Sequence, residues 1–229
     1  MNDYRAMIPH TLQWEAGISA RKTDSASADP IRGTFVINGK KYVDPHTNKG
    51  ITWATFKSYA KILGYEATPD LFFKMPQNIW EQIFKRAYWD RVHASDVNSA
   101  AIAQIITQWA WGSGVGGWYA AKQKYVGALG IMRNYLHTKG YVVGDWQTAV
   151  DRLNTVIRSQ GERKTVDELF AARKAFLLAI PGDANDKGWL RRMDDFYKHV
   201  TTFIKDNPGT STGIVAAIAI GVFAAMLSN

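Results

Sequence analysis

Apolar residues recur with helical spacing through most of the chain, and only one segment has the pattern of a β-hairpin. From Ile51 onward the apolar positions repeat on one helical face, most clearly at 79–88 and 102–109. The hairpin pattern lies at 34–43, where Asn38-Gly39 suits the two positive-φ positions of a type I′ turn. The sequence therefore predicts a mainly α fold with one small β-hairpin.

Composition narrows the class of protein. The chain has 229 residues and no cysteine, which excludes disulfides, thiolate zinc sites and cysteine nucleophiles. Its five histidines never pair at HxxxH or HExxH spacing, so we expect no metal and no cofactor. The net charge of +8 favours a polyanionic partner, which could be nucleic acid, an anionic membrane or an acidic cell-wall polymer. Nine Trp, ten Tyr and ten Phe exceed the needs of a core, so we expect some in a groove.

The chain divides into three predicted parts. Residues 1–120 contain the hairpin, and residues 121–206 form a basic helical region in which Thr165–Glu168 has the pattern of a capping box that opens a helix. The stretch Gly213–Leu227 has no charge and is apolar on every face, so 207–229 is predicted to be a linker and a transmembrane tail. A buried core helix is the alternative for so short a stretch.

Four stretches, in order, resemble the glycoside hydrolase 108 family, also called secretion-activator or TtsA-like muramidases. They are Trp14–Gly17, Thr47–Thr55, Ala87–Asp90 and Lys187–Arg192, similar to the family's E-G-G, T-N-x-G-I-T, R-Y-W-D and K-G-W-x-x-R elements. The resemblance covers about residues 4–206. It implies a mainly helical, lysozyme-like (α+β) fold that hydrolyses the glycan strand of peptidoglycan, with 121–206 as a peptidoglycan-binding region.

The chain departs from the family pattern at three places. Ala16 stands in the E-G-G segment, residues 18–46 form a long insert, and the later F-D-x-x-x-N-S-G element has Gln108 and Gly112 in place of its acid and its asparagine. These departures leave the second catalytic group open.

Hydrolysis of a glycosidic bond needs an acid, and either an activated water or a carboxylate nucleophile. The acid must stay protonated near neutral pH, which an aromatic cleft favours. Glu15, beside Trp14 at the end of a predicted helix, fits this role, and the resemblance implies it. Asp44 is the candidate second carboxylate; Asp24 and Asp29 are alternatives, and Asp44 could instead start a turn.

Two threonines are candidates for holding the attacking water. They are Thr47 and Thr52, although either hydroxyl could instead cap the helix that starts near Trp53. His46 is expected to be a groove or surface residue and not a base. The Gly112–Gly117 run could let the backbone approach the glycan closely.

Aromatic and amide side chains near these motifs are candidates for substrate binding. Asn48 could hydrogen-bond an N-acetyl group, and Trp89 is expected to be a better sugar platform than Tyr88, for which core packing is the alternative. The candidate substrate-binding residues are Trp14, Asn48, Tyr88, Trp89, Trp111 and Trp189.

These observations together predict an N-acetylmuramidase that cleaves the β-1,4 bond between N-acetylmuramic acid and N-acetylglucosamine, in phage-like lysis or wall remodelling. The alternative is a non-catalytic peptidoglycan-binding or secretion-assembly protein on the same fold. Only charge and aromatic content favour nucleic acid, so we expect no nucleic-acid partner. The tail predicts a membrane-associated bacterial or phage enzyme that acts on the cell wall with a holin or secretion partner.

Overall fold

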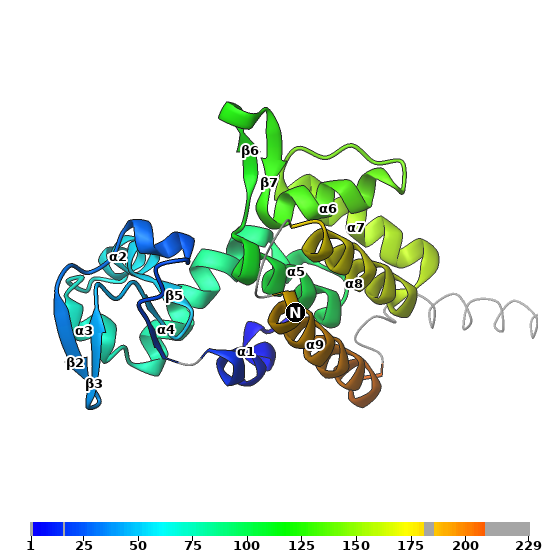
Figure 1. Cartoon of the computed structure of the whole chain (residues 1–229). Helices are drawn as coiled ribbons and strands as arrows, with labels where there is room; N and C mark the ends of the chain where they lie inside the picture. The colour runs from blue at the N-terminus through cyan, green and yellow to red at the C-terminus, as the bar shows by residue number, and fades with distance from the viewer. Residues whose placement is uncertain (1, 16, 181–185, 209–229) are drawn as a thin grey trace, which may run out of the picture. The chain divides into compact units, whose positions relative to one another are not determined.

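The computed structural model describes residues 2–15, 17–180 and 186–208. Helices joined by short loops and strands account for most of this chain (Figure 1), which confirms the predicted mainly α class. The described residues form two compact units, one within residues 4–91 and the other from residue 92 to residue 208 together with residues 2 and 3. This division concerns packing, and the functional boundaries predicted at residues 120 and 206 stay predictions.

The unit of residues 4–91 is held by an aromatic core. A 3₁₀ turn, Tyr4–Met7, leads into its first helix, and a π-helical turn, Lys85–Trp89, continues its last helix. The apolar stripe predicted near 79–88 is buried except for its last residue, Tyr88, which is half-buried, and within it the Trp80 ring stacks on Phe84 with centroids 5.1 Å apart. The helices are α1 (Ile8–Trp14), α2 (Trp53–Ile62), α3 (Pro69–Phe73) and α4 (Gln77–Phe84).

Two small antiparallel sheets belong to this unit. The predicted hairpin is present as β2 (Thr34–Ile37) and β3 (Lys40–Val43), with positive φ at Asn38 and Gly39. A three-stranded sheet of order β1-β4-β5 is an addition to the prediction, because two-residue strands are too short to give an alternating pattern. Its strands are β1 (Ile18–Ser19), β4 (Thr47–Asn48) and β5 (Ile51–Thr52).

The second unit is built around α5 (Ala100–Ser113). The predicted stripe of Ile102, Ile105, Ile106 and Trp109 is buried, and α5 packs against α6, α8 and α9 (Figure 1). A third small sheet, β6 (Gly117–Tyr119) with β7 (Lys124–Val126), projects from these helices. The remaining helices are α6 (Gly127–His137), α7 (Trp146–Gln160), α8 (Glu162–Leu178) and α9 (Asp186–Asp206).

The glycine run after α5 serves the β6–β7 hairpin. Gly116 has φ +82, and a Cβ there would collide with the carbonyl of Val126 on the facing strand. A Cβ at Gly127 would likewise lie 2.6 Å from the Gly116 Cα. The sequence predicts that this run lets the backbone approach a glycan closely. At Gly116 the close approach is instead to strand β7 of the same chain.

The predicted capping box at the start of α8 is wrong. The helix begins at Glu162, directly after Gly161, whose φ of +87 lets the chain turn from α7 into α8. Thr165 thus lies inside the first turn, where its hydroxyl donates to the Gly161 carbonyl at 2.8 Å. A glycine that ends one helix and starts the next leaves no room for a separate cap.

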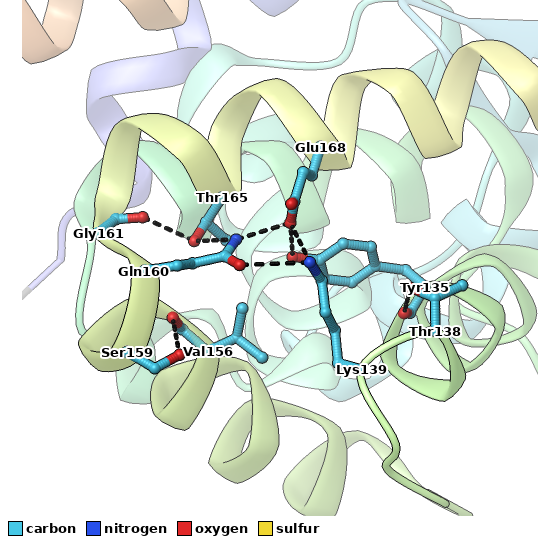
Figure 2. Close-up of polar contacts among 9 residues, drawn as sticks. All are labelled: Tyr135, Thr138, Lys139, Val156, Ser159, Gln160, Gly161, Thr165 and Glu168. Atoms are coloured by element: carbon cyan, nitrogen blue, oxygen red, sulfur yellow. Dashed lines mark hydrogen bonds and ion pairs between the residues drawn. The ribbon is translucent and has the colours of Figure 1, made fainter.

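A polar network joins α6, α7 and α8 (Figure 2). Glu168 Oε2 accepts hydrogen bonds from the Tyr135 hydroxyl at 3.0 Å and from Gln160 Nε2 at 2.6 Å, and lies 2.7 Å from Lys139 Nζ. Burial alone would raise the pKa of Glu168, but the hydrogen bonds from Gln160, Lys139 and Tyr135 outweigh it and lower that pKa. Burial and the bond to Glu168 raise the pKa of Tyr135, which keeps its hydroxyl a donor.

The predicted transmembrane stretch, Gly213–Leu227, lies outside the described residues. Within residues 2–15, 17–180 and 186–208, none of the helices is both long enough and apolar enough to span a bilayer. Membrane association therefore stays a prediction from the sequence.

We expect Glu168→Gln to lower the free energy of unfolding at neutral pH by about 1–3 kcal/mol, because Lys139 loses its carboxylate in a partly buried site. Folding lowers the pKa of Glu168, so its stabilisation is present above the pKa of the unfolded chain and is lost as the pH falls through the folded value. Urea unfolding at a series of pH values gives the free energy of unfolding of the wild type and of Glu168→Gln. The difference between the two free energies should become smaller in acid.

Glu66→Gln is the matched control, because Glu66 is exposed. It should change the free energy of unfolding by less than about 0.5 kcal/mol. A difference between wild type and Glu168→Gln that persists unchanged to about pH 3 would show that the network does not depend on the carboxylate charge.

Candidate active site

Glu15 is held between the first helix and the three-stranded sheet. Its backbone N–H donates to the Leu12 carbonyl at 3.1 Å, which ends α1 as the sequence predicts. Two residues later, the Gly17 carbonyl accepts the Lys49 N–H at 2.8 Å, which ties this segment to the β4–β5 turn. The side chains of Glu15 and Trp14 are both half-buried. The position of Glu15 thus depends on the turn at Lys49.

The β4–β5 hairpin sets the two candidate threonines opposite each other. Thr47 pairs directly with Thr52 across the strands, and both are half-buried. Thr52 is also the N-cap of α2, since its Oγ1 accepts the Thr55 N–H at 3.2 Å and donates to Thr55 Oγ1 at 2.9 Å. The sequence leaves open whether one of these threonines caps α2. Thr52 is that cap, and its hydroxyl already donates one hydrogen bond and accepts another.

His46 is fully buried beside Thr47, so the expectation of a groove or surface residue is wrong. Its Nε2 lies 3.1 Å from the Arg21 carbonyl and its Nδ1 lies 2.8 Å from Thr47 Oγ1. A carbonyl can only accept, so Nε2 carries the hydrogen, and in the neutral ring Nδ1 accepts from the Thr47 hydroxyl. The Thr47 hydroxyl therefore donates its hydrogen to His46, and its oxygen can still accept a hydrogen bond from another group.

Tyr88 connects the threonines to Glu15. Burial raises the pKa of Tyr88 to about 12; a hydrogen bond with Thr55 opposes that rise, and the charges of Tyr59 and Glu15 add to it. The phenol is therefore protonated at neutral pH, and the Glu15 carboxylate is close enough to act on it. A series of hydroxyls, from Tyr88 through Thr55 to Thr52, leads from the neighbourhood of Glu15 to the sheet.

Asp44 has a structural contact at the base of the β2–β3 hairpin. It has φ +48, its Oδ1 accepts the Gly33 N–H at 2.8 Å and its Oδ2 lies 3.4 Å from Arg32. The two alternative acids also have local contacts, because Asp24 caps a 3₁₀ turn and Asp29 pairs with a lysine of α2. The second catalytic carboxylate thus stays a prediction.

Two predicted substrate-binding residues lie in the core instead. Asn48 is 2% exposed, and its amide nitrogen donates to the Phe72 and Phe73 carbonyls at the end of α3, so it fastens β4 to that helix. Trp89 is 1% exposed. In this π-helical turn Trp89 is buried, whereas Tyr88, whose ring centroid lies 6.1 Å from that of Phe84, is the more exposed of the pair.

The other predicted aromatic residues belong to the second unit. Trp111 is half-buried on α5, and Trp189 on α9 is 37% exposed. Sequence reasoning missed Trp118 and Tyr119 on β6, which are 57% and 45% exposed. The sequence signal for these two residues is an aromatic pair followed by Lys122 and another lysine. It is missed because the preceding glycine run is interpreted as the feature that contacts the glycan.

Residues 8–114 match the model of the Glycosyl hydrolase 108 family, the family that the motifs resemble, and the match contains the first three of the four motifs. This match implies a glycoside hydrolase that acts on peptidoglycan.

Among solved structures, that of SagA from Brucella abortus is similar. It is 19% identical, covers 87% of this chain and 94% of its own, and superposes with a TM-score of 0.56. At this identity the likeness concerns the fold, and it agrees with the predicted mainly α, lysozyme-like class. Comparison with curated proteins finds no match.

The environment of Tyr88 leads to a spectroscopic prediction. In protein labelled with carbon-13 at the tyrosine Cζ, the Tyr88 signal should stay at its protonated position up to about pH 11, because burial holds its pKa near 12. Tyr88→Phe assigns the signal by its loss. A Tyr88 midpoint near the ordinary value of about 10 would contradict the buried geometry.

Proposed function

We propose that this protein is an N-acetylmuramidase that hydrolyses the β-1,4 bond between N-acetylmuramic acid and N-acetylglucosamine. In this proposal Glu15 donates a proton to the leaving oxygen, and Thr47 holds the water that attacks the sugar. Asp44 is the proposed second carboxylate. The family match over residues 8–114 includes all three positions and supports the assignment.

The observation that carries the proposal is the linkage of Glu15 and Thr47 through one small sheet. The segment after Glu15 becomes β1, and β1 pairs with β4, so that Ser19 lies opposite Thr47. A general acid and a water-holding group need fixed relative positions, since small displacements cost much of the rate. Backbone hydrogen bonds of a sheet supply that rigidity.

Thr47 is better suited than Thr52 to hold water. In the described part of the chain, the Thr47 hydroxyl has one hydrogen bond, to His46. Its lone pairs can therefore accept a proton of the water, which turns the water oxygen outward as a nucleophile. Thr52, by contrast, caps α2 and supports the strand opposite Thr47.

Tyr88 supports Glu15 as the acid. Because the phenol is protonated and near the carboxylate, it can donate a hydrogen bond to the substrate or to Glu15 as the bond breaks. Half-buried Trp14 beside Glu15 offers an apolar wall for a sugar ring. We therefore assign Trp14 and Tyr88 to substrate binding around the acid.

The second unit is proposed to bind the wall. Its exposed aromatic side chains, Trp118, Tyr119 and Trp189, offer faces on which sugar rings stack. Residues 121–165 carry eight basic and three acidic residues, a net +5, which favours an anionic polymer. Recruitment to a membrane through 213–227, and a holin or secretion partner, rest on the sequence alone.

We expect Glu15→Gln to lower the rate of peptidoglycan digestion by about 100-fold or more, because an amide cannot donate the proton that the leaving oxygen needs. The release of new reducing ends from purified peptidoglycan by the full-length protein measures this. Glu66→Gln, at an exposed position, is the matched control and should digest at the wild-type rate.

The same assay tests the water-holding group. Thr47→Val removes the hydroxyl at nearly constant shape and should lower the rate about 10- to 100-fold, whereas Thr47→Ser should recover most of it. Asp44→Asn keeps an oxygen for the Gly33 N–H, so a loss of rate there without a loss of stability would assign the carboxylate to catalysis.

The non-catalytic alternative has a distinct result. If wild type and Glu15→Gln both bind peptidoglycan and neither releases reducing ends, the protein is a binding module on this fold. Equal digestion by the two proteins would instead remove Glu15 from the role of acid.

A further inference from the structure

A cavity of about 300 Å³ lies in the second unit, whereas the residues assigned above to catalysis belong to the first unit. It is lined mainly by α5, α8 and α9, and most of its wall is aromatic or aliphatic, including Trp109, Phe170 and Phe196. Among the described residues, the wall also contains two arginines, Arg173 and Arg192, and neither aspartate nor glutamate. A cavity of this size with apolar walls and a few polar groups is typical of a small-ligand site.

Arg173 is the unusual member of this wall. It is 7% exposed, and in the described part of the chain no carboxylate lies within ion-pair distance of it. Its recorded contacts are a hydrogen bond from Nη1 to Ser113 Oγ at 2.7 Å and the ring of Phe176, whose centroid lies 5.4 Å from its guanidinium carbon. Burial and the charge of Arg192 lower the pKa of Arg173 to about 10, so the side chain is still charged at neutral pH.

A buried charge without a counter-ion is costly, and proteins almost always pair it. The position is also prepared for the guanidinium, since a Cβ on Gly112 would lie 3.1 Å from Arg173 Nη2. Because Ser113 Oγ accepts from Arg173, its own hydrogen remains available to a ligand. The polar groups Arg173, Arg192 and Ser113 thus supply donors and positive charge toward one apolar cavity.

We propose that this cavity binds a carboxylate that carries a short apolar group. The guanidinium fork of Arg173 holds the carboxylate by two parallel hydrogen bonds, and the apolar group packs against Phe170 and Phe176. Such a group occurs at the carboxyl end of a short peptide and in a free aliphatic acid. The site belongs to a different unit from Glu15, and the proposal stands independently of the proposed hydrolysis.

Isothermal titration calorimetry of the full-length protein with N-acetyl-D-alanyl-D-alanine tests the proposal. We expect saturable binding, and binding about 10- to 100-fold weaker for the C-terminal amide of the same dipeptide, because the amide lacks the charge that Arg173 pairs. Butyrate is the second probe: binding equal to that of the dipeptide assigns the site to free acids, and weaker binding assigns it to peptide ends. Inorganic phosphate is the third probe and should bind weakly, since it offers nothing to the apolar wall.

Three variants separate the role of Arg173 from folding. Arg173→Met should abolish binding of the carboxylate while keeping the melting temperature at least at the wild-type value, because it removes a buried charge that no carboxylate of the described residues pairs. Gly112→Ala, which favours the helix and displaces the guanidinium, should weaken binding about tenfold or more. The matched control is Arg191→Met, an exposed neighbour of Arg192 on α9, which should bind as the wild type does.

Several results would overturn the proposal. These are the absence of saturable binding of both acids, equal binding of the dipeptide and its amide, and wild-type affinity in both Arg173→Met and Gly112→Ala. Binding of phosphate without binding of either carboxylate would overturn the assignment of an apolar carboxylate. A digestion assay on Glu15→Gln distinguishes these failures from failure of the proposed hydrolase, because it does not involve the cavity.

Discussion

The tight turn at Lys49-Gly50 is the constraint on which the N-terminal unit depends. Both residues have positive φ, which allows β4 and β5 to pair through a two-residue loop. The turn is fastened on two sides: the Lys49 carbonyl accepts the Trp80 indole N–H at 2.9 Å, and its N–H donates to Gly17 at 2.8 Å. The Lys49-Gly50 turn therefore holds α4, the β1-β4-β5 sheet and the segment that follows Glu15 in fixed positions relative to one another.

Buried polar groups around this turn convert a simple hairpin into a rigid site. Asn48 satisfies two carbonyls at the end of α3, and His46 holds the hydroxyl of Thr47 while donating to Arg21. Each of these contacts is costly to break in a buried setting, because the remaining partner loses its hydrogen bond. Asn48 therefore contributes to the site by holding β4 against α3, and not by contacting a ligand. This explains why a residue inside the Thr47–Thr55 motif is buried in the core.

Helix α8 contains two charged groups that are handled in opposite ways. Glu168 is satisfied by Lys139, Gln160 and Tyr135, and these contacts tie α8 to the C-terminal ends of α6 and α7. On the same helix, Arg173 is buried with a hydroxyl and a ring but no carboxylate among the described residues. The first arrangement stabilises the packing of the helices, whereas the second is the one for which we propose a carboxylate ligand.

Much of this could be predicted from the residues. Helical periodicity identified the buried faces of α4 and α5, and Asn38-Gly39 identified the hairpin, because both signals are local. The exchange of roles between Tyr88 and Trp89 could not be predicted, since the π-helical turn shifts the face by one residue only in the folded chain. Likewise, the capping pattern at Thr165 was overridden by Gly161, and the burial of His46 and Asn48 depends on partners distant in sequence.

Digestion of purified peptidoglycan in oxygen-18 water, with mass spectrometry of the products, tests the central claim most directly. Hydrolysis by a water held at Thr47 predicts new N-acetylmuramic acid reducing ends that carry one oxygen-18 atom. Anhydro ends without the label would mean that no water attacks, and labelled N-acetylglucosamine ends would mean that the other glycosidic bond is cleaved. Either of these two results would contradict the muramidase assignment.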